Sequence, residues 1–95
     1  MTQAHHISLL DEDEALSREE LAQLCHVEAA WIDELASHGV ITPLAGTRFS
    51  AVTITTLHKA RRLEQDFALN IPGVALALDL LDEIERLRTE LRRRG

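Results

Sequence analysis

Histidine and cysteine are the side chains in this sequence best suited to metal binding or nucleophilic chemistry, and their spacing argues against both. The chain holds five histidines and a single cysteine. His5 and His6 are adjacent, so on a regular element they point apart. The other three lie too far apart in sequence to indicate a shared site, namely His26, His38 and His58. With one cysteine there is no zinc-knuckle spacing, and we predict no bound metal.

The remaining polar chemistry does not indicate an enzyme either. Cys25 falls on the apolar face of a predicted helix, where a buried structural thiol is the favoured interpretation. A lone cysteine also excludes an internal disulfide and fits a reducing compartment. The carboxylates lie on exposed helix faces with nothing apolar nearby to raise a pKa. Four scattered glycines form no phosphate-binding loop, so we predict no enzyme and no cofactor.

Composition is typical of one small soluble helical domain. The 95 residues are 45% hydrophobic and 27% charged. Only Trp31, Phe49 and Phe67 are aromatic, so the core must use aliphatic side chains, which favours helices. No stretch reaches the ~18 apolar residues of a membrane span, and the start "MTQAHHISLLDEDEAL" lacks the features of a secretion signal. We expect a cytoplasmic protein without membrane contact.

Charge divides the chain into two unlike halves. Residues 1–47 hold nine acids and only one base, Arg18, which gives a formal charge of −8. Residues 48–95 hold nine bases and seven acids, a formal charge of +2. An acidic half of this kind repels nucleic acid and attracts a basic partner, although it can also serve solubility alone.

The acidic half has the pattern of two short helices joined by a turn. Ser17 and Glu20 form a capping box before a helix predicted over 18–25. A second helix is predicted over about 28–38, and Gly39 stands where a helix-ending glycine belongs. In a helix-turn-helix unit this second helix usually enters the DNA major groove. Here it contains no Lys or Arg but three acids.

A small wing and a third helix are predicted next. The segment "VITPLAGTRFS" reads as a hairpin, with arms at 40–41 and 48–49 and a turn at 45–46. Ser50 is placed to cap a third helix over about 51–67.

The last predicted helix carries an apolar stripe with a heptad repeat. Asn70 caps it, Pro72 suits its first turn, and it runs to about residue 94. From Ala77 to Leu91 its apolar residues are separated by 3, 4, 3 and 4 positions, which predicts a homodimer. The predicted interface residues are Leu80, Ile84, Leu87 and Leu91. In the alternative, they pack back on the third helix of the same chain.

Together these elements predict a mainly α fold. It consists of a winged helix-turn-helix with a small β-wing and a long C-terminal helix. We divide the chain into an N-terminal segment at 1–16 that is a short strand or a tail, the winged helix-turn-helix at 17–68, and the C-terminal helix at 69–95.

The motif "GVITP…GTRFS…L…RRL" resembles the winged-helix segment of MerR-type regulators. There a Gly-hydrophobic-Ile-x-Pro turn precedes a Gly-x-Arg-aromatic wing. In DNA-binding members the preceding helix carries an Arg and aromatic residues that face the duplex. The aligned positions here are Asp33, Glu34 and Leu35, which reverses the charge at the DNA contact.

A narrower resemblance covers the C-terminal half. "LEQDFALNIPGVALALDLLDEIERLRTELRRR" is similar to the chaperone modulator family CbpM, in its Pro-Gly turn at Pro72 and Gly73 and in the Leu-rich helix that follows. With the turn and wing, the resemblance spans about 17–91. It implies a regulator that binds the J-domain of a DnaJ-like co-chaperone, CbpA, and keeps it from the DnaK-type chaperone. It also implies that the J-domain presents a basic second helix.

An acidic helix-turn-helix suits such a basic target. The residues we predict to contact the J-domain are Glu19, Glu20, Glu28, Trp31, Asp33 and Glu34. Trp31 has two interpretations, as a cap on the small core or as an exposed interface anchor.

Two other functions stay open at this stage. A MerR-type transcriptional regulator would have to contact phosphate through Arg48, Lys59, Arg61 and Arg62. A structural dimer without a regulatory role is the third possibility. We favour the J-domain regulator, and we predict no appreciable DNA binding.

Overall fold

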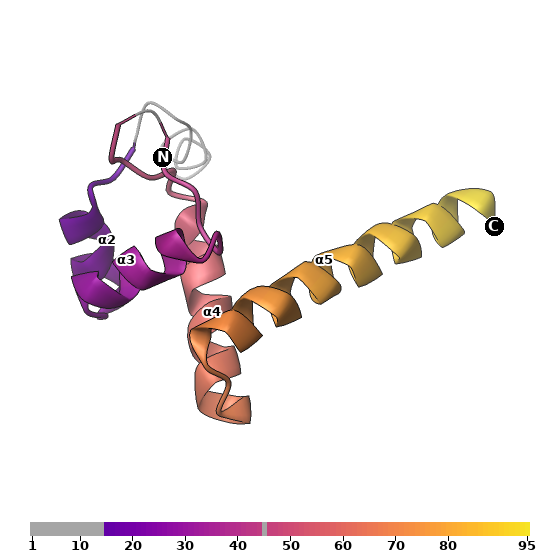
Figure 1. Cartoon of the computed structure of the whole chain (residues 1–95). Coiled ribbons are helices and arrows are strands. Elements are labelled where there is room, and N and C mark those ends of the chain that lie inside the picture. Colours follow the sequence, from indigo (N-terminus) through magenta and orange to yellow (C-terminus); the bar gives the residue numbers. More distant parts are fainter. Residues whose placement is uncertain (1–14, 45) are drawn as a thin grey trace.

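The structure is a computed structural model that describes residues 15–44 and 46–95. Within these residues the chain forms four helices, α2 (Arg18–Cys25), α3 (Ala29–Ser37), α4 (Thr53–Phe67) and α5 (Ile71–Arg94). α2 packs against α3 and α4, and α4 packs against α5. α5 leaves the other helices and runs outward as a long arm (Figure 1). The predicted N-terminal strand or tail falls largely outside the described residues.

The helix-turn-helix begins and ends where local sequence signals predict. The Ser17 hydroxyl accepts a hydrogen bond from the Glu20 N–H at 3.1 Å, and the Glu20 carboxylate accepts one from the Ser17 N–H at 2.8 Å. This reciprocal capping box starts α2 at the predicted residue. Gly39, with φ of +76°, follows the end of α3, and the Val40 N–H donates to the Leu35 carbonyl at 2.9 Å. This arrangement closes the C-terminus of α3.

The predicted β-wing is wrong. Its two arms do not pair with each other, and in the described part of the chain the only β-bridge joins Leu16 to Phe49. The first arm is not free to pair, because the Val40 N–H donates to the Leu35 carbonyl at the C-terminus of α3. Pro43 has no N–H to donate to a ladder. What remains of the wing is a loop in which the Leu44 N–H donates to the Arg48 carbonyl at 2.7 Å.

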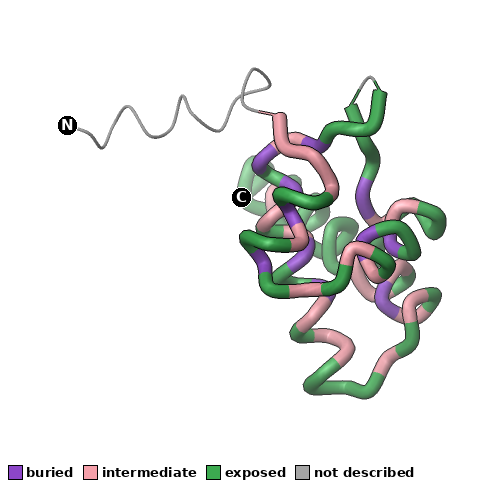
Figure 2. The backbone as a smooth tube through the Cα atoms, turned by 90° about the vertical axis from the view of Figure 1, so that its left-hand side faces the viewer, coloured by how far each residue is buried: buried purple, intermediate pink, exposed green. Residues whose placement is uncertain are grey.

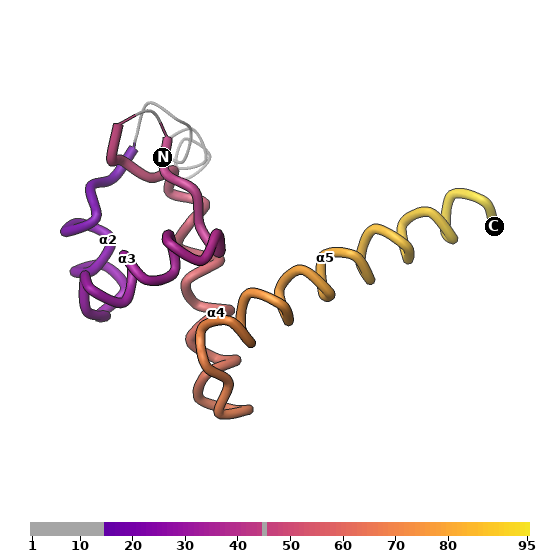
Figure 3. Tube along the Cα trace, viewed as in Figure 1, coloured from indigo at the N-terminus to yellow at the C-terminus, as the bar shows by residue number. Residues whose placement is uncertain are grey.

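The third and fourth predicted helices are confirmed with shifted starts. α4 begins at Thr53, because residues 51–52 form a turn in which the Ser50 hydroxyl accepts from the Val52 N–H at 3.2 Å. Ala68, in the left-handed region with φ of 55°, ends α4, and Figure 3 traces the chain as it reverses there. The Asn70 side chain then caps α5 by accepting from the Gly73 N–H at 2.8 Å.

One small core joins all four helices. Figure 2 shows the buried positions distributed over the packed part of the chain, between exposed and half-buried ones. The core residues are Leu21, Cys25, Ile32, Leu35, Ile41, Phe49, Leu57, Ala60 and Val74. Leu21 is fully buried, so truncation to Ala would cost about 2–5 kcal/mol. We call this packed unit, residues 15–78 without residue 45, the head.

Beyond the head, α5 has no partner within the described chain. Its inner face packs on the core through the buried Val74 and the partly buried Leu78. From residue 79 to residue 94, the segment we call the arm, every residue except Thr89 is exposed. No helix among the described residues is both long enough and apolar enough to cross a membrane.

Candidate protein-binding surfaces

The groups that first suggested chemistry lie apart in the structure. His26 is in the turn after α2, His38 follows α3, and His58 is on α4, and all three are exposed. Among the described residues, no three His, Cys, Asp or Glu side chains are grouped to hold a metal ion. Cys25 is a free thiol in the core, and burial raises its pKa, which keeps it protonated and unreactive.

The acidic residues of α2 and α3 are organised around one cation, Arg18. Its guanidinium holds Asp33 in a bidentate pair, with Nε to Oδ1 at 2.8 Å and Nη2 to Oδ2 at 2.7 Å. Its Nη1 also lies 2.6 Å from Oε2 of Glu19. The pair therefore links the start of α2 to the middle of α3, fifteen residues apart in sequence. Sequence reasoning placed Glu19 and Asp33 on one surface but missed the cation between them.

This pairing changes the ionisation of both carboxyl groups. The hydrogen bonds from Arg18 lower the pKa of Asp33 below its usual value. The pKa of Glu19 is also lowered, first by a hydrogen bond to its own backbone and then by Arg18. The same contacts raise the pKa of Arg18, so all three groups stay charged. Part of the negative charge of α3 is thus neutralised within the chain.

The other three acidic residues of the predicted contact surface differ in whether their carboxylates are already bound within the chain. Glu20 is engaged in the capping box, and its Oε1 lies 3.6 Å from Nη2 of Arg48. Glu28 is the N-cap residue of α3 and makes no side-chain cap hydrogen bond. Glu28 and Glu34 are exposed, and within residues 15–44 and 46–95 neither forms an ion pair. They are the most available carboxylates on this surface.

Trp31 lies between α3 and α4. Its side chain is half-buried and packs against the edge of the core. Its indole Nε1–H donates to Oε2 of Glu64 at 2.7 Å, across 33 residues of sequence. Trp31 also lines an open hollow of about 290 Å³ whose other walls are His26, Val27, Glu28, Arg61, Glu64 and Gln65. One part of the ring therefore supports the core, and another part is open to the solvent beside Glu28.

A second surface runs along the arm. Leu80, Ile84, Leu87 and Leu91, which we call the apolar seam, are 54%, 45%, 44% and 68% exposed. They do not pack on α4, because the face of α5 that meets the head is the one that carries Val74 and Leu78. The alternative in which the seam packs back on its own chain is therefore wrong.

Comparison with known proteins agrees with this architecture. A sequence model of the MerR HTH family of regulatory proteins matches residues 16–93. The chaperone modulatory protein CbpM of Pseudomonas entomophila (strain L48) is 39% identical over 74 residues, which cover 74% of this chain and 73% of the relative. The protein of the same name from Coxiella burnetii (strain Dugway 5J108-111) is 33% identical over 88 residues, which cover 88% of this chain and 83% of the relative.

The chain belongs to the CbpM family. A third relative, the chaperone modulatory protein CbpM of Pseudomonas putida (strain W619), is 34% identical over 74 residues, covering 74% of this chain and 73% of that protein. The match to MerR regulators and the matches to CbpM proteins confirm both resemblances drawn from the sequence.

Two of the four cations that a DNA-binding relative would need are engaged within this CbpM family member. Arg48 donates to the Ala15 carbonyl at 2.8 Å, which ties the loop before α4 to the start of the head. Arg61 donates to the Cys25 carbonyl at 3.2 Å, at the end of α2. Lys59 and Arg62 are exposed on α4. Two of the four proposed phosphate contacts thus have structural roles.

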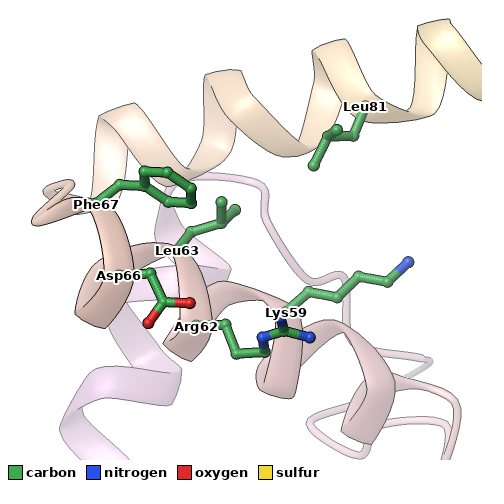
Figure 4. Close-up of a pocket in the computed structure, with 6 residues that line it drawn as sticks. All are labelled: Lys59, Arg62, Leu63, Asp66, Phe67 and Leu81. Atoms are coloured by element: carbon green, nitrogen blue, oxygen red, sulfur yellow. The ribbon is translucent and has the colours of Figure 1, made fainter.

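Lys59 and Arg62 border a hollow between α4 and α5 that sequence reasoning missed. Its volume is about 220 Å³, and Leu63, Asp66, Phe67 and Leu81 complete its lining. In Figure 4, Leu63 and Phe67 from α4 and Leu81 from α5 point into the space between the two helices. Phe67 is 68% exposed, so the hollow presents apolar surface to the solvent.

Proposed function

We propose that this CbpM family member regulates a DnaJ-like co-chaperone of the CbpA type by binding its J-domain and blocking access to the DnaK-type chaperone. The observation that carries the proposal is the acidic surface of α2 and α3, which stands where a DNA-binding helix-turn-helix presents cations. Such a surface suits the basic second helix of a J-domain. The names of the relatives support a role in chaperone modulation.

Within this surface, the availability of each carboxylate ranks the contact residues. Glu28 and Glu34 are exposed and form no ion pair within the described residues, so a basic partner can reach them without displacing an internal cation. Asp33 and Glu19 bind Arg18, and a partner must compete with that guanidinium. Glu20 borders the same surface next to Arg48. Charges of this kind steer association more than they add affinity.

Trp31 would supply the apolar centre of the interface. Tryptophan is enriched among the residues that dominate binding energy, and in a complex such residues lie in well-packed pockets from which water is excluded. The hollow beside Trp31 is also lined by Glu28, so a partner that enters it can contact both the ring and this carboxylate. Because the indole N–H is already bound to Glu64, the ring would contribute its apolar face and not a hydrogen bond.

We also propose that the chain is a homodimer through Leu80, Ile84, Leu87 and Leu91. Four large aliphatic side chains in heptad spacing are exposed on one helix, and a second copy of the same helix is the partner that such a seam fits. The seam belongs to the arm, away from α2 and α3 (Figure 1), so dimer formation leaves the acidic surface free for a J-domain.

Calorimetric titration against an isolated CbpA-type J-domain tests the docking surface. Glu34→Lys should weaken binding several-fold at ~50 mM salt, because it places a cation opposite a basic surface, and the loss should shrink at ~300 mM salt. The matched control is Asp66→Lys, which makes the same charge change at an exposed helical position on α4. Equal binding by the two variants would show that α2 and α3 do not form the docking surface.

The same titration separates the two interpretations of Trp31. If the ring is an interface anchor, Trp31→Ala loses binding while its melting temperature stays close to that of the parent. If the ring mainly supports the core, the melting temperature falls, and Trp31→Phe restores most of it because the ring still packs between α3 and α4.

A further inference from the structure

The hollow between α4 and α5 combines exposed apolar walls with two cations. Its apolar walls are Leu63 and Phe67 from α4 and Leu81 from α5, and they point into the space between the two helices (Figure 4). Phe67 is 68% exposed and Leu81 is 50% exposed, so this apolar surface is open to water. Lys59 and Arg62 complete the lining on the side nearer the start of α4.

The two cations have no anionic partner within the described chain. Neither Lys59 nor Arg62 forms an ion pair there. Lys59 also lines a neighbouring hollow with Asp79 and Asp82, but no ion pair joins it to either of them. Asp66 is the one carboxylate in the lining of the hollow between α4 and α5. The chemistry that fits this hollow is a segment with apolar side chains next to several carboxylates.

The sequence that precedes the head has this chemistry in the matching order. Residues 7–10 read Ile-Ser-Leu-Leu, and residues 11–14 read Asp-Glu-Asp-Glu, a formal charge of −4. Going back from Ala15, the four carboxylates come first and the apolar side chains follow. Along α4, the cations likewise come before Phe67. A segment that runs beside α4 from its start would therefore bring carboxylates to cations and apolar side chains to apolar walls.

The described chain begins close to the start of α4. The Leu16 and Phe49 backbones exchange two hydrogen bonds of 2.7 Å, and the Arg48 side chain donates to the Ala15 carbonyl at 2.8 Å. From its first residue, Thr53, α4 rises about 21 Å to Phe67. Eight extended residues before Ala15 span about 26 Å. The segment is therefore long enough to follow α4 as far as the hollow.

We propose that residues 7–14 dock along α4 of their own chain. The apolar side chains of residues 7–10 fill the hollow, and the carboxylates of residues 11–14 lie beside Lys59 and Arg62. These are the two proposed phosphate contacts that have no structural role in the head. The docked segment thus occupies the place that a polyanion would need and shields α4 from nucleic acid. This proposal rests neither on J-domain binding nor on the homodimer.

A spin label in the full-length chain tests the docking. Ser8→Cys carries a nitroxide, and Cys25 is not labelled because it is only 4% exposed. The amide signals of Leu63, Phe67 and Leu81 should lose most of their intensity through proximity to the nitroxide. The amide of Leu24, exposed on α2, is the reference and should keep its intensity. Weak broadening spread evenly over the head, or stronger broadening on α2, would overturn the proposal.

Charge reversal and rescue test the ion pairs. In the spin-labelled chain, Lys59→Glu/Arg62→Glu should restore most of the lost intensity at Phe67 and Leu81. Adding Asp11→Lys/Asp13→Lys to that variant should bring the broadening back, which a merely misfolded variant would not do. Arg92→Glu/Arg93→Glu, the same charge change on the arm, is the control and should leave the broadening in place. Unchanged broadening in Lys59→Glu/Arg62→Glu would contradict the assigned contacts.

An isotope-mixing experiment separates docking within a chain from docking between copies. The spin-labelled chain without isotope label is mixed with an isotope-labelled chain that carries no nitroxide. The proposal is supported if the signals of Leu63, Phe67 and Leu81 stay intact in this mixture. Broadening as strong as in the doubly labelled chain would mean that the segment docks on a second copy, and the proposal would be wrong.

Neutralising the segment tests the shielding. In a gel shift with random duplex DNA at ~50 mM salt, Asp11→Asn/Asp13→Asn should bind about 3- to 10-fold more tightly than Glu28→Gln/Glu34→Gln. The control removes the same charge from exposed carboxylates on the acidic surface. Equal affinity of the two variants would show that the segment acts only through net charge, and the shielding role would be wrong.

Discussion

Replacing Ile84 with alanine removes one side chain from the middle of the apolar seam without touching the head. Ile84 is 45% exposed in the single chain and lies in the arm, so it is not part of the core. Alanine is the best helix former, so α5 itself should persist. We therefore expect Ile84→Ala to weaken dimer formation and to leave the melting of the head unchanged.

The expected size follows from the exposed area that dimerisation would bury. Full burial of an isoleucine side chain contributes about 1.5–3 kcal/mol. Because 45% of Ile84 is still exposed, its burial contributes about 0.7–1.4 kcal/mol in each chain. Both copies of a symmetric dimer carry the substitution, so the dimer loses this burial free energy twice, about 1.4–2.7 kcal/mol. The dissociation constant should therefore rise about 10- to 100-fold.

Sedimentation velocity or light scattering over a concentration series measures the change. The control is Leu24→Ala on α2, which removes a similarly exposed aliphatic side chain, 58% exposed, from a surface outside the seam. Leu24→Ala should dimerise like the parent. A parent that stays monomeric at high micromolar concentration would refute the reasoning, as would identical dimer constants for Ile84→Ala and the parent.

Three further outcomes are expected. Ser17→Ala removes half of the capping box and should cost about 1 kcal/mol, seen as a drop of several degrees in thermal unfolding, while a neutral result would mean that the box contributes nothing. Because the pKa of Asp33 is lower in the folded chain than its unfolded value of about 3.9, its pair with Arg18 stabilises the fold above about pH 4 and is lost on further acidification. The stability difference between the parent and Arg18→Gln should therefore shrink between pH 6 and pH 3, and a constant difference would contradict this. In a gel shift, the protein should show no micromolar affinity for random duplex DNA at ~150 mM salt, since the acidic surface repels phosphate.

The features that sequence reasoning predicted well depend on local signals. The capping box at Ser17 sets the first residue of α2, and Gly39 sets the end of α3, because each acts within a few residues of itself. Asn70 and Pro72 likewise mark the start of α5. The exposed seam also follows from spacing alone, since period and residue type decide which face of a long helix is apolar.

The features that it missed are contacts between distant segments. The prediction of the wing was wrong because Val40 bonds to Leu35 at the end of α3 and Phe49 pairs with Leu16. A local hairpin pattern does not reveal either of these bonds. The Arg18–Asp33 pair and the bond from Trp31 to Glu64 also join residues far apart in sequence. Charge counting over the acidic half located the candidate surface but could not show which carboxylates are already neutralised.

Amide chemical-shift mapping with an unlabelled CbpA-type J-domain tests the central claim most directly. On titration, the labelled chain should show its largest shifts on α2 and α3, centred on Glu28, Trp31 and Glu34, with the Trp31 indole signal among them. The amide shifts of residues 79–94 should stay as they are in the free protein. The account is contradicted if the J-domain binds and the shifts cluster on the arm or on the hollow between α4 and α5. It is equally contradicted if no shift occurs at millimolar J-domain.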